Sequence, residues 1–364
     1  MKVAFYAPLK SPNHPTPSGD RTLARQLMSC LSDFCEEVTL ASECRSLEKR
    51  GDEQRQKQLI DSAETETARL LETYQNQGQT PDIWFTYHLY YKAPDLIGPS
   101  VSKALNIPYV AAEASRAPKR ATGPWQLFHK KAEAAIDHAS IIFHLTKRDR
   151  ECLELVRPEH QRLVHLPPFI EPPDVPSSHG LKDKTIRLIT IAMMRSGDKM
   201  ASYTILANTL TELANHNWIL DIIGDGPSSD EVHQLFKPFS SRVKFLGKIE
   251  DINQKNAHLS SSDIFIWPGI NEAFGLVYLE AQALGLPVIA LDTAGVPEVV
   301  SEGETGLLAD PLKPAQMAQN LNRLMEDNAL RSQLSRRATT HIQSQHTKEK
   351  ATAILRESLE HLKS

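Results

Sequence analysis

The chain has 364 residues, more than a single hydrophobic core usually organises, so we expect two domains. Hydrophobic residues make up 40% and charged residues 24%, ordinary globular values that exclude a disordered chain. With 41 Lys and Arg against 45 Asp and Glu, the formal charge is -4, which gives no reason to expect nucleic acid as a partner. The apolar runs are too short to span a membrane and the first residues lack the apolar core of a secretion signal, so we expect a cytoplasmic protein.

Short β-branched runs alternate with helical segments along the chain, a pattern typical of parallel sheets covered by helices. In the first half these runs are apolar on both faces, as central parallel strands require. We expect strands at residues 2–7, 37–42, 82–88, 108–114, 140–146 and 162–166. They predict a Rossmann-like α/β domain over residues 1–170. The polar segment 46–79 is predicted to be a solvated helix with a loop.

A proline-rich stretch at residues 167–184 can form neither a helix nor a central strand, and we interpret it as an interdomain linker. The alternation then restarts and predicts a second doubly wound parallel sheet within residues 185–344. Its strands are expected at residues 186–194, 219–224, 243–247, 263–267 and 288–291. The last helix, residues 347–364, carries apolar residues at helical spacing, and we expect it to complete the first domain.

The most informative segment is a strand that ends at Trp267, followed by a glycine-containing loop and a helix that begins near Gly275. The free N–H groups of the first helical turn form an anion site that suits a phosphate. Glu272 precedes that turn and Glu280 lies one turn inside it, and carboxylates accept hydrogen bonds from sugar hydroxyls. Taken alone, two such glutamates are more often surface residues favoured by the helix dipole.

Cations and glycines follow other strands of the second domain. Arg195 and Lys199 lie in the turn after its first strand, where strand carboxyl ends line the ligand crevice of a parallel sheet. Both can neutralise a diphosphate, and the alternative is a surface turn with two salt-bridged cations. Gly224 and Gly247 end two further strands, the second followed by Lys248, and glycine lets a nucleotide approach the backbone.

The first domain has its own candidates at strand ends. Gly19 and Asp20 follow the first strand and open a helix, a second candidate anion cradle. His88 and Glu113 end two successive strands, and a neutral His88 packed against a tyrosine is the alternative to a functional histidine. Arg116 begins a run of basic residues interleaved with aromatic ones, which fits contact with an anionic membrane or a solvated charge run.

Several motifs together resemble the E-x7-E signature of retaining GT-B glycosyltransferases of family 4. They are Glu272 and Glu280 around Phe274-Gly275-Leu276, then Gly285-Leu286-Pro287, Gly295-Val296-Pro297-Glu298 and Gly306-Leu307-Leu308. The resemblance implies a GT-B-like fold of two doubly wound parallel-sheet domains facing each other across a cleft. Residues 1–170 with 347–364 would bind the acceptor, and residues 185–344 the nucleotide-sugar donor.

The resemblance also implies roles for single residues. Glu272 would contact the donor sugar and Glu280 the ribose, while the backbone amides of Phe274, Gly275 and Leu276 would hold the sugar or the distal phosphate. Arg195 and Lys199 would bind the pyrophosphate. The nucleotide base would be bordered by Gly224, Gly247 and the main chain of Lys248.

In the first domain the match is incomplete. The family usually carries Gly-Gly where this chain has Ser18 and Gly19, so Gly19 alone carries over. His88 stands where a sugar-binding His is common, and we group it with the catalytic residues. Glu113 stands where relatives often have a His, which indicates unusual acceptor recognition. Asp20, Glu113 and Arg116 are the acceptor-binding candidates.

These observations predict a retaining glycosyltransferase with a nucleotide-diphosphate sugar as co-substrate and no other cofactor. The chain has no Asp-x-Asp motif, so we expect no metal site, with cations and helix dipoles in place of the metal. The acceptor is expected to be a saccharide or lipid-linked, as in cell-envelope polysaccharide synthesis, with peripheral contact to the inner face of the membrane. The alternatives are a non-catalytic nucleotide-sugar-binding homologue and a nucleotide-sugar epimerase.

Overall fold

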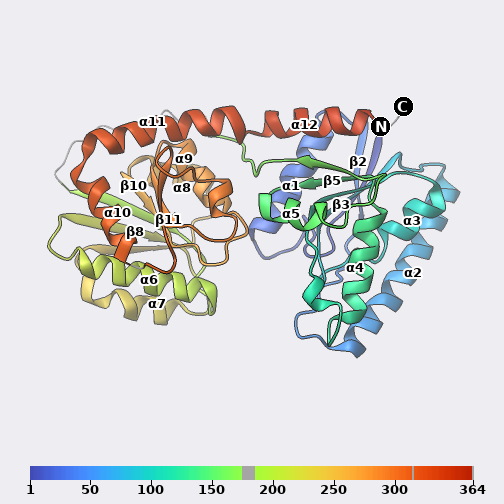
Figure 1. The fold of residues 1–364 in the computed structure, drawn as a ribbon, viewed down its shortest axis with the longest axis horizontal. Helices are drawn as coiled ribbons and strands as arrows, with labels where there is room; N and C mark the ends of the chain where they lie inside the picture. Colours follow the sequence, from blue (N-terminus) through green and yellow to red (C-terminus); the bar gives the residue numbers. More distant parts are fainter. Residues whose placement is uncertain (174–184, 314, 363–364) are drawn as a thin grey trace. The chain divides into compact units, whose positions relative to one another are not determined.

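The computed structural model describes residues 1–364 except 174–184, 314 and 363–364 (Figure 1). The chain divides into two compact units. Unit 1 comprises Met1–Pro167 and Lys348–Ser364, and unit 2 comprises Pro168–Thr347. The change of unit at Pro167 falls at the start of the segment predicted to be the linker, most of which lies outside the described residues.

Unit 1 contains a parallel six-stranded sheet in the order β2-β1-β3-β4-β5-β6. The strands are β1 (Lys2–Tyr6), β2 (Glu37–Ser42), β3 (Ile83–Leu89), β4 (Tyr109–Ala114), β5 (Ile141–His144) and β6 (Arg162–His165). The central strands are buried on both faces, as their apolar sequences require. The chain first moves outward from β1 to β2 and then returns to β3 on the other side, so the direction of winding reverses between β1 and β3.

Helices cover both faces of this sheet (Figure 1). They are α1 (Gly19–Ser32), α2 (Glu53–Gln77), α3 (Gly98–Leu105), α4 (Gln126–His138), α5 (Lys147–Glu154) and α12 (Lys348–Glu360), with the short η1 (Pro118–Arg120). Helix α12 packs on α1, whereas α2 packs against α3 and α4. Helix α2 is not purely solvated as expected, because Leu59, Ala63 and Leu70 are buried at one face and the last two join the core.

Unit 2 repeats the arrangement with the strand order β12-β11-β10-β7-β8-β9, again all parallel. Its strands are β7 (Ile186–Ile191), β8 (Trp218–Ile223), β9 (Val243–Gly247), β10 (Ile264–Ile266), β11 (Val288–Leu291) and β12 (Gly306–Ala309). Strand β12 was not predicted, because it is a four-residue edge strand that begins with glycine. The winding direction reverses between β7 and β10.

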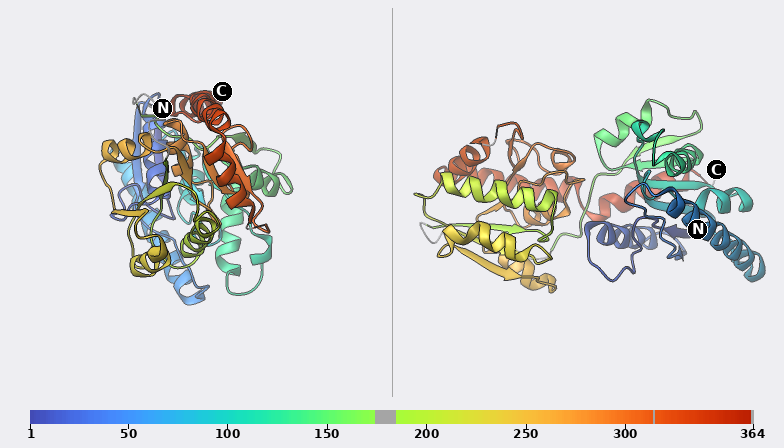
Figure 2. Two further views of the ribbon diagram at one scale, coloured as in Figure 1. Left: turned by 90° about the vertical axis from the view of Figure 1, so that its left-hand side faces the viewer. Right: turned by 90° about the horizontal axis from the view of Figure 1, so that it is seen from below.

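The helices of unit 2 also form two layers. They are α6 (Asp198–Glu212), α7 (Ser229–Phe236), α8 (Ile252–Ser260), α9 (Leu276–Ala283), α10 (Ala315–Glu326) and α11 (Asn328–Gln345), with the short η2 (Lys237–Phe239) and η3 (Val296–Glu298). Helices α6 and α7 pack side by side over one face, and α9 packs on α11 (Figure 2). The prediction of two doubly wound, Rossmann-like α/β sheets is therefore confirmed. Among the helices of the described residues, none is long and apolar enough to cross a membrane.

Candidate functional site

The reversal of winding in unit 2 brings a predicted cation and a predicted carboxylate together. Lys199 lies in the first turn of α6, after β7, and Glu272 lies in the loop after β10. The ammonium of Lys199 donates to Glu272 Oε1, and the indole of Trp267 donates to the same oxygen at 3.2 Å. The Lys199 and Glu272 side chains are only 19% and 18% exposed. The pair is therefore fixed at the carboxyl edge of the sheet, where an open α/β sheet binds its ligands.

The loop between β10 and α9 is held in shape by close backbone contacts. Gly269 and Gly275 have positive φ angles, and a Cβ added at either would collide with Tyr278. The Tyr278 hydroxyl is buried and donates to the carbonyl of Trp267 at 3.1 Å. Tyr278 was not among the predicted residues, since its position two residues into α9 gives no sign that the loop folds over its ring.

A second loop packs against this one through its backbone. The N–H of Gly295 donates to the carbonyl of Glu272 at 3.1 Å, and a Cβ added at Gly295 would overlap the carbonyl oxygen of Ala273. Ala294 and Asn271, one in each loop, adopt left-handed φ angles of 50° and 52°, which are costly for residues with a Cβ. Strain of this kind persists where the surrounding structure imposes it, often at functional sites.

Helix α9 begins beside this pair of loops. Its N-cap is Gly275, which has no side chain to bond the first-turn N–H groups. Phe274 and Leu276 on either side of the cap are almost fully buried, so the first turn is anchored by its apolar side chains. This turn therefore lacks a side-chain cap, and the anion site expected here stays a prediction.

Glu280, one turn further along α9, is also paired. Lys255 of α8 places its Nζ 2.8 Å from Glu280 Oε1, and the two side chains are 17% and 26% exposed. Sequence reasoning missed Lys255, because it stands mid-helix with no motif around it. Both glutamates of the predicted pair thus have a lysine partner, which argues against the interpretation of Glu272 and Glu280 as solvated surface residues.

The other predicted residues of unit 2 lie at the same edge of the sheet. Gly224 directly follows β8 with φ 151°, a conformation that favours glycine, and a Cβ there would collide with the carbonyl of Ala192. Gly247 ends β9 with φ 66°. Arg195 is exposed in the turn after β7, and the exposed ammonium of Lys248 pairs with Glu250.

In unit 1, His88 and Glu113 occupy matching positions on neighbouring strands. The ladder pairs Tyr87 with Ala112 and Leu89 with Ala114, so His88 and Glu113 face each other between two regular pairs. Both have left-handed φ angles, 60° and 57°. Two adjacent non-glycine residues in this conformation indicate a backbone that is held there by its surroundings.

Their side chains meet Asp20 at the reversal point of this sheet. His88 Nδ1 lies 3.3 Å from Asp20 Oδ1 and 3.6 Å from Glu113 Oε1. Burial alone would lower the pKa of His88, but the carboxylates of Glu113 and Asp20 outweigh it and raise that pKa to about 9. Burial raises the pKa of Glu113 to about 7. The carboxyl groups of Glu113 and Asp20 thus favour the charged form of His88, whose ring centroid lies 5.3 Å from that of Tyr90.

A third carboxylate, Asp149, completes this group and was missed by the sequence analysis. The hydroxyls of Ser115 and Thr146 donate to its two oxygens at 2.6 and 2.7 Å. Its charge contributes to the pKa shifts of both His88 and Glu113. The only sequence signal for Asp149 is its spacing from Thr146. Thr146 stands at the N-cap of a helix and Asp149 lies in its first turn.

Arg116 does not join this group, so its predicted place beside the acceptor candidates is corrected. Its side chain is 2% exposed and is bound to Glu133 and to Asp137 Oδ1, the latter at 2.6 Å. The aromatic residues of the same run are not available to a membrane either, since Trp125 and Phe128 are buried. The local pattern did not show that these residues face the interior of unit 1.

Gly19 is the first residue of α1, and nothing lies within 4 Å of the position of an added Cβ. The hydroxyl of Ser18 caps this helix by accepting the N–H of Arg21 at 3.3 Å. Asp20 brings a negative charge into the same turn. One first-turn amide is thus already used and an anion would meet a carboxylate, which weakens the prediction of an anion cradle here.

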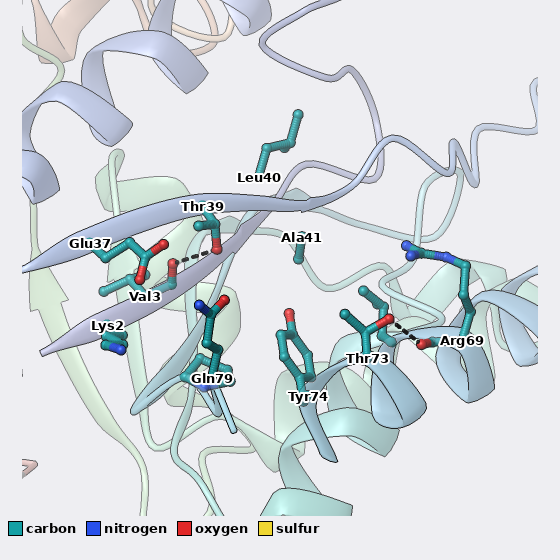
Figure 3. A pocket seen from close by; sticks show the side chains of 12 residues that line it. Lys2, Val3, Glu37, Thr39, Leu40, Ala41, Arg69, Thr73, Tyr74 and Gln79 are labelled. Atoms are coloured by element: carbon teal, nitrogen blue, oxygen red, sulfur yellow. Dashed lines mark hydrogen bonds between the residues drawn. The ribbon is translucent and has the colours of Figure 1, made fainter. Parts of the chain in front are cut away.

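A separate pocket of about 200 Å³ lies beside the amino end of β1 and along β2 (Figure 3). It is lined by residues of these strands and of α2, among them Lys2, Glu37, Thr39, Arg69 and Tyr74. The carboxyl ends of the strands, which carry His88 and its partners, are at the opposite edge of the sheet. The pocket is therefore not part of the candidate site.

Comparison with known proteins gives this geometry a chemical context. Residues 176–341 match the family model described as "Glycosyl transferases group 1". The matched range contains all the candidate residues of unit 2, from Arg195 to Glu280, and none of those of unit 1.

Two curated relatives match part of the chain. N-acetyl-alpha-D-glucosaminyl L-malate synthase of Bacillus anthracis is 34% identical over 131 residues, which are 35% of this chain and 34% of that protein. D-inositol 3-phosphate glycosyltransferase of Paenarthrobacter aurescens is 42% identical over 84 residues, 23% of this chain and 21% of that protein. The matches thus span about a third or less of these relatives.

Solved structures match over the whole chain. Sucrose-phosphate synthase from Thermosynechococcus elongatus has a TM-score of 0.73 at 15% identity, covering 100% of this chain and 99% of that one. Anabaena Alr3699/HepE, solved in complex with UDP, has a TM-score of 0.72 at 17% identity, covering 99% and 100%. At such identities the likeness concerns the fold, and the predicted GT-B class is confirmed.

Proposed function

We propose that this chain is a retaining, metal-independent glycosyltransferase that moves a sugar from a nucleotide-diphosphate donor to a saccharide or lipid-linked acceptor. The observation that carries the proposal is the pairing of Glu272 with Lys199 and of Glu280 with Lys255 around the uncapped start of α9. Carboxylates suit sugar and ribose hydroxyls, while the amides and lysines suit phosphates. The family match over residues 176–341 supports the same chemistry.

In this proposal the leaving diphosphate is stabilised by charge that is already in place. Lys199 and Arg195 neutralise its oxygens, and the amides of Phe274, Gly275 and Leu276 hold the sugar or the distal phosphate. Glu272 contacts the donor sugar. These cations and the helix dipole take the part that a divalent ion plays in metal-dependent enzymes.

The nucleoside end of the donor would lie across the neighbouring strand ends. Glu280 accepts from the ribose hydroxyls, and Gly224, Gly247 and the main chain of Lys248 border the base. The complex of Alr3699/HepE with UDP supports a nucleoside diphosphate as the ligand, and the base is a matter for direct screening.

Retention of the anomeric configuration follows, in this proposal, from a front-face reaction. The departing phosphate oxygen takes the proton of the acceptor hydroxyl, so no protein nucleophile is needed. His88 is placed among the catalytic residues because it lies at the reversal point of the sheet in unit 1. Its charged form, held by Asp20 and Glu113, would orient hydroxyls.

We place the reaction in cell-envelope polysaccharide synthesis, at the cytoplasmic side of the membrane. The acceptors named for two relatives, L-malate and D-inositol 3-phosphate, show how widely acceptors vary among similar proteins. The exposed side chains of Lys119, Arg120 and Lys131 support contact with anionic lipid. Flotation with anionic liposomes tests that contact, and absence of binding would remove it from the proposal.

A thermal-shift screen against nucleoside diphosphates tests the donor site first. A ligand at 100 times its dissociation constant should add about 2.7 kcal/mol of stability. Donor hydrolysis and transfer are then measured with the nucleotide sugars of the selected base. Binding without turnover would instead favour a non-catalytic homologue, conversion of one nucleotide sugar into another would favour an epimerase, and absence of binding would contradict all three.

A further inference from the structure

The group at the carboxyl ends of β1, β3 and β4 in unit 1 has one buried hydrogen-bond acceptor that the described chain leaves unused. We infer that it binds the hydroxyl groups of an uncharged sugar and rejects the same sugar when it carries phosphate or carboxylate. The inference deepens the proposed function, on which it rests, by assigning the acceptor an uncharged class.

The first support is an acceptor atom without a donor. Glu113 is 7% exposed, and its Oε1 faces His88 Nδ1 at 3.6 Å. His88 Nδ1 and Glu113 Oε2 are both buried and have no hydrogen-bond partner within the described parts of the chain. A buried acceptor left without a donor is costly, so this oxygen favours a ligand that donates. Sugar hydroxyls donate, whereas ionised phosphate and carboxylate groups only accept.

The second support is the surrounding charge. Asp20, Glu113 and Asp149 all act on His88, whose Nδ1 is already directed at the first two. Lys10 also acts on Asp20. Three carboxyl groups therefore act on the one ring of His88. An anionic ligand would add charge of the sign already in excess, which disfavours it in a partly buried site.

The same arrangement argues against a cationic ligand. An ammonium group that approached Glu113 would meet the charged ring of His88, which occupies the position between Asp20 and Glu113. An uncharged hydroxyl meets neither repulsion. It can donate to Glu113 Oε2 and accept at its own oxygen, so a polyol satisfies the group better than either ion.

The group is also fixed before any ligand binds. Ser115 and Thr146 hold the two oxygens of Asp149 at 2.6 and 2.7 Å. Because both hydroxyls donate to Asp149, its oxygens are already engaged and less available to a ligand. Asp20, whose side chain is 37% exposed, is the open side of the group. Because these side chains are already fixed, we expect the charge of the sugar to change its binding affinity and not the folding of unit 1.

The test is ligand-observed NMR on the full chain with matched sugar pairs, in the presence of the nucleoside diphosphate selected by the thermal-shift screen. The pairs are myo-inositol with inositol 3-phosphate, and methyl glucoside with methyl glucoside 6-phosphate and methyl glucuronide. We expect the uncharged member of at least one pair to bind about tenfold or more tightly than its anionic counterpart. Glu113→Gln, which keeps the shape but replaces Oε1 or Oε2 with a donor, should reduce that ratio to about threefold or less.

Glu64→Gln is the matched control, because it removes an exposed carboxylate on α2 and should leave the ratio unchanged. Equal or tighter binding of the anionic sugars to the unaltered protein would overturn the inference. So would a ratio that Glu113→Gln does not change. Absence of binding by every sugar, with the nucleoside diphosphate still bound, overturns the inference and leaves the donor proposal standing, whereas loss of nucleotide binding contradicts the proposed function itself.

Discussion

Lys255 of α8 and Glu280 of α9 form an ion pair of 2.8 Å in unit 2, although the two residues belong to different helices and to no common motif. Because Lys255 holds Oε1 of Glu280, the other carboxylate oxygen keeps a fixed direction. A fixed acceptor of this kind suits a hydrogen bond from a ribose hydroxyl. We therefore regard Lys255 as a positioning residue that acts through Glu280.

Replacing Lys255 should weaken donor binding more than it slows the reaction. Lys255→Met removes the partner of Glu280, and a partly buried pair worth about 1 kcal/mol corresponds to about a fivefold rise in the KM for the donor. We expect kcat to change by less than about twofold, since Lys255 does not touch the reacting atoms. Steady-state kinetics of Lys57→Met, which breaks a pair of 64% and 67% exposed side chains, provide the control. An unchanged KM would show that Lys255 does not position Glu280.

Glu272 and Lys199 should be required for transfer. Glu272→Ala or Lys199→Ala removes one member of the preorganised pair, and loss of a single such group typically lowers kcat by roughly 10²- to 10³-fold. Circular dichroism should show an intact fold in both. Lys313→Ala, at a 73% exposed surface lysine, serves as the control. Turnover close to that of the unaltered protein in either variant would refute the assigned roles.

Two neighbouring residues in one loop, Ala294 and Gly295, should differ strongly in how much stability a change at Cβ costs. In Gly295→Ala the new Cβ overlaps the carbonyl of Ala273, so the loop that carries Glu272 must move. We expect a loss of about 2–4 kcal/mol of stability, together with weaker nucleotide binding. Ala294→Gly relieves a left-handed φ of 50° and should stay within about 1 kcal/mol of the unaltered protein. Urea unfolding measures both, and equal stability of the two variants would contradict the close approach.

The stability of unit 1 should fall as the pH rises above neutrality. The pKa of His88 is raised from 6.5 to about 9, so its charged form stabilises the folded state. That contribution is complete below pH 6.5 and is lost as the pH rises to about 9, with an upper limit of about 3 kcal/mol. The raised pKa of Glu113, about 7 against 4.5, changes stability in the same direction.

Urea unfolding between pH 6 and 9.5 should therefore show a steeper loss of stability for the unaltered protein than for His88→Gln. His144→Gln is the control, because burial lowers the pKa of His144 to about 4 and the ring stays neutral throughout this range. Parallel curves for the unaltered protein and His88→Gln would mean that His88 is not held in its charged form.

Much of the fold could be read from local pattern. Runs such as Ile264–Ile266 and Val288–Leu291 are apolar on both faces, and that pattern alone predicts buried parallel strands. The short β12 escaped prediction because four residues that begin with glycine give little signal. The candidate site of unit 2 was predicted residue by residue for Glu272, Glu280 and Lys199, since a helix start and a strand end are local features.

What the sequence by itself determined is therefore the set of strands and helices and the residues at their ends. Only the tertiary structure decided which ends meet. Glu272 pairs with Lys199, which lies 73 positions away in the chain, and Arg116 pairs with Glu133 and Asp137 instead of joining the group around His88. The physical reason is that strand and helix periodicity acts between near neighbours, whereas strand order and side-chain pairing depend on burying distant segments together.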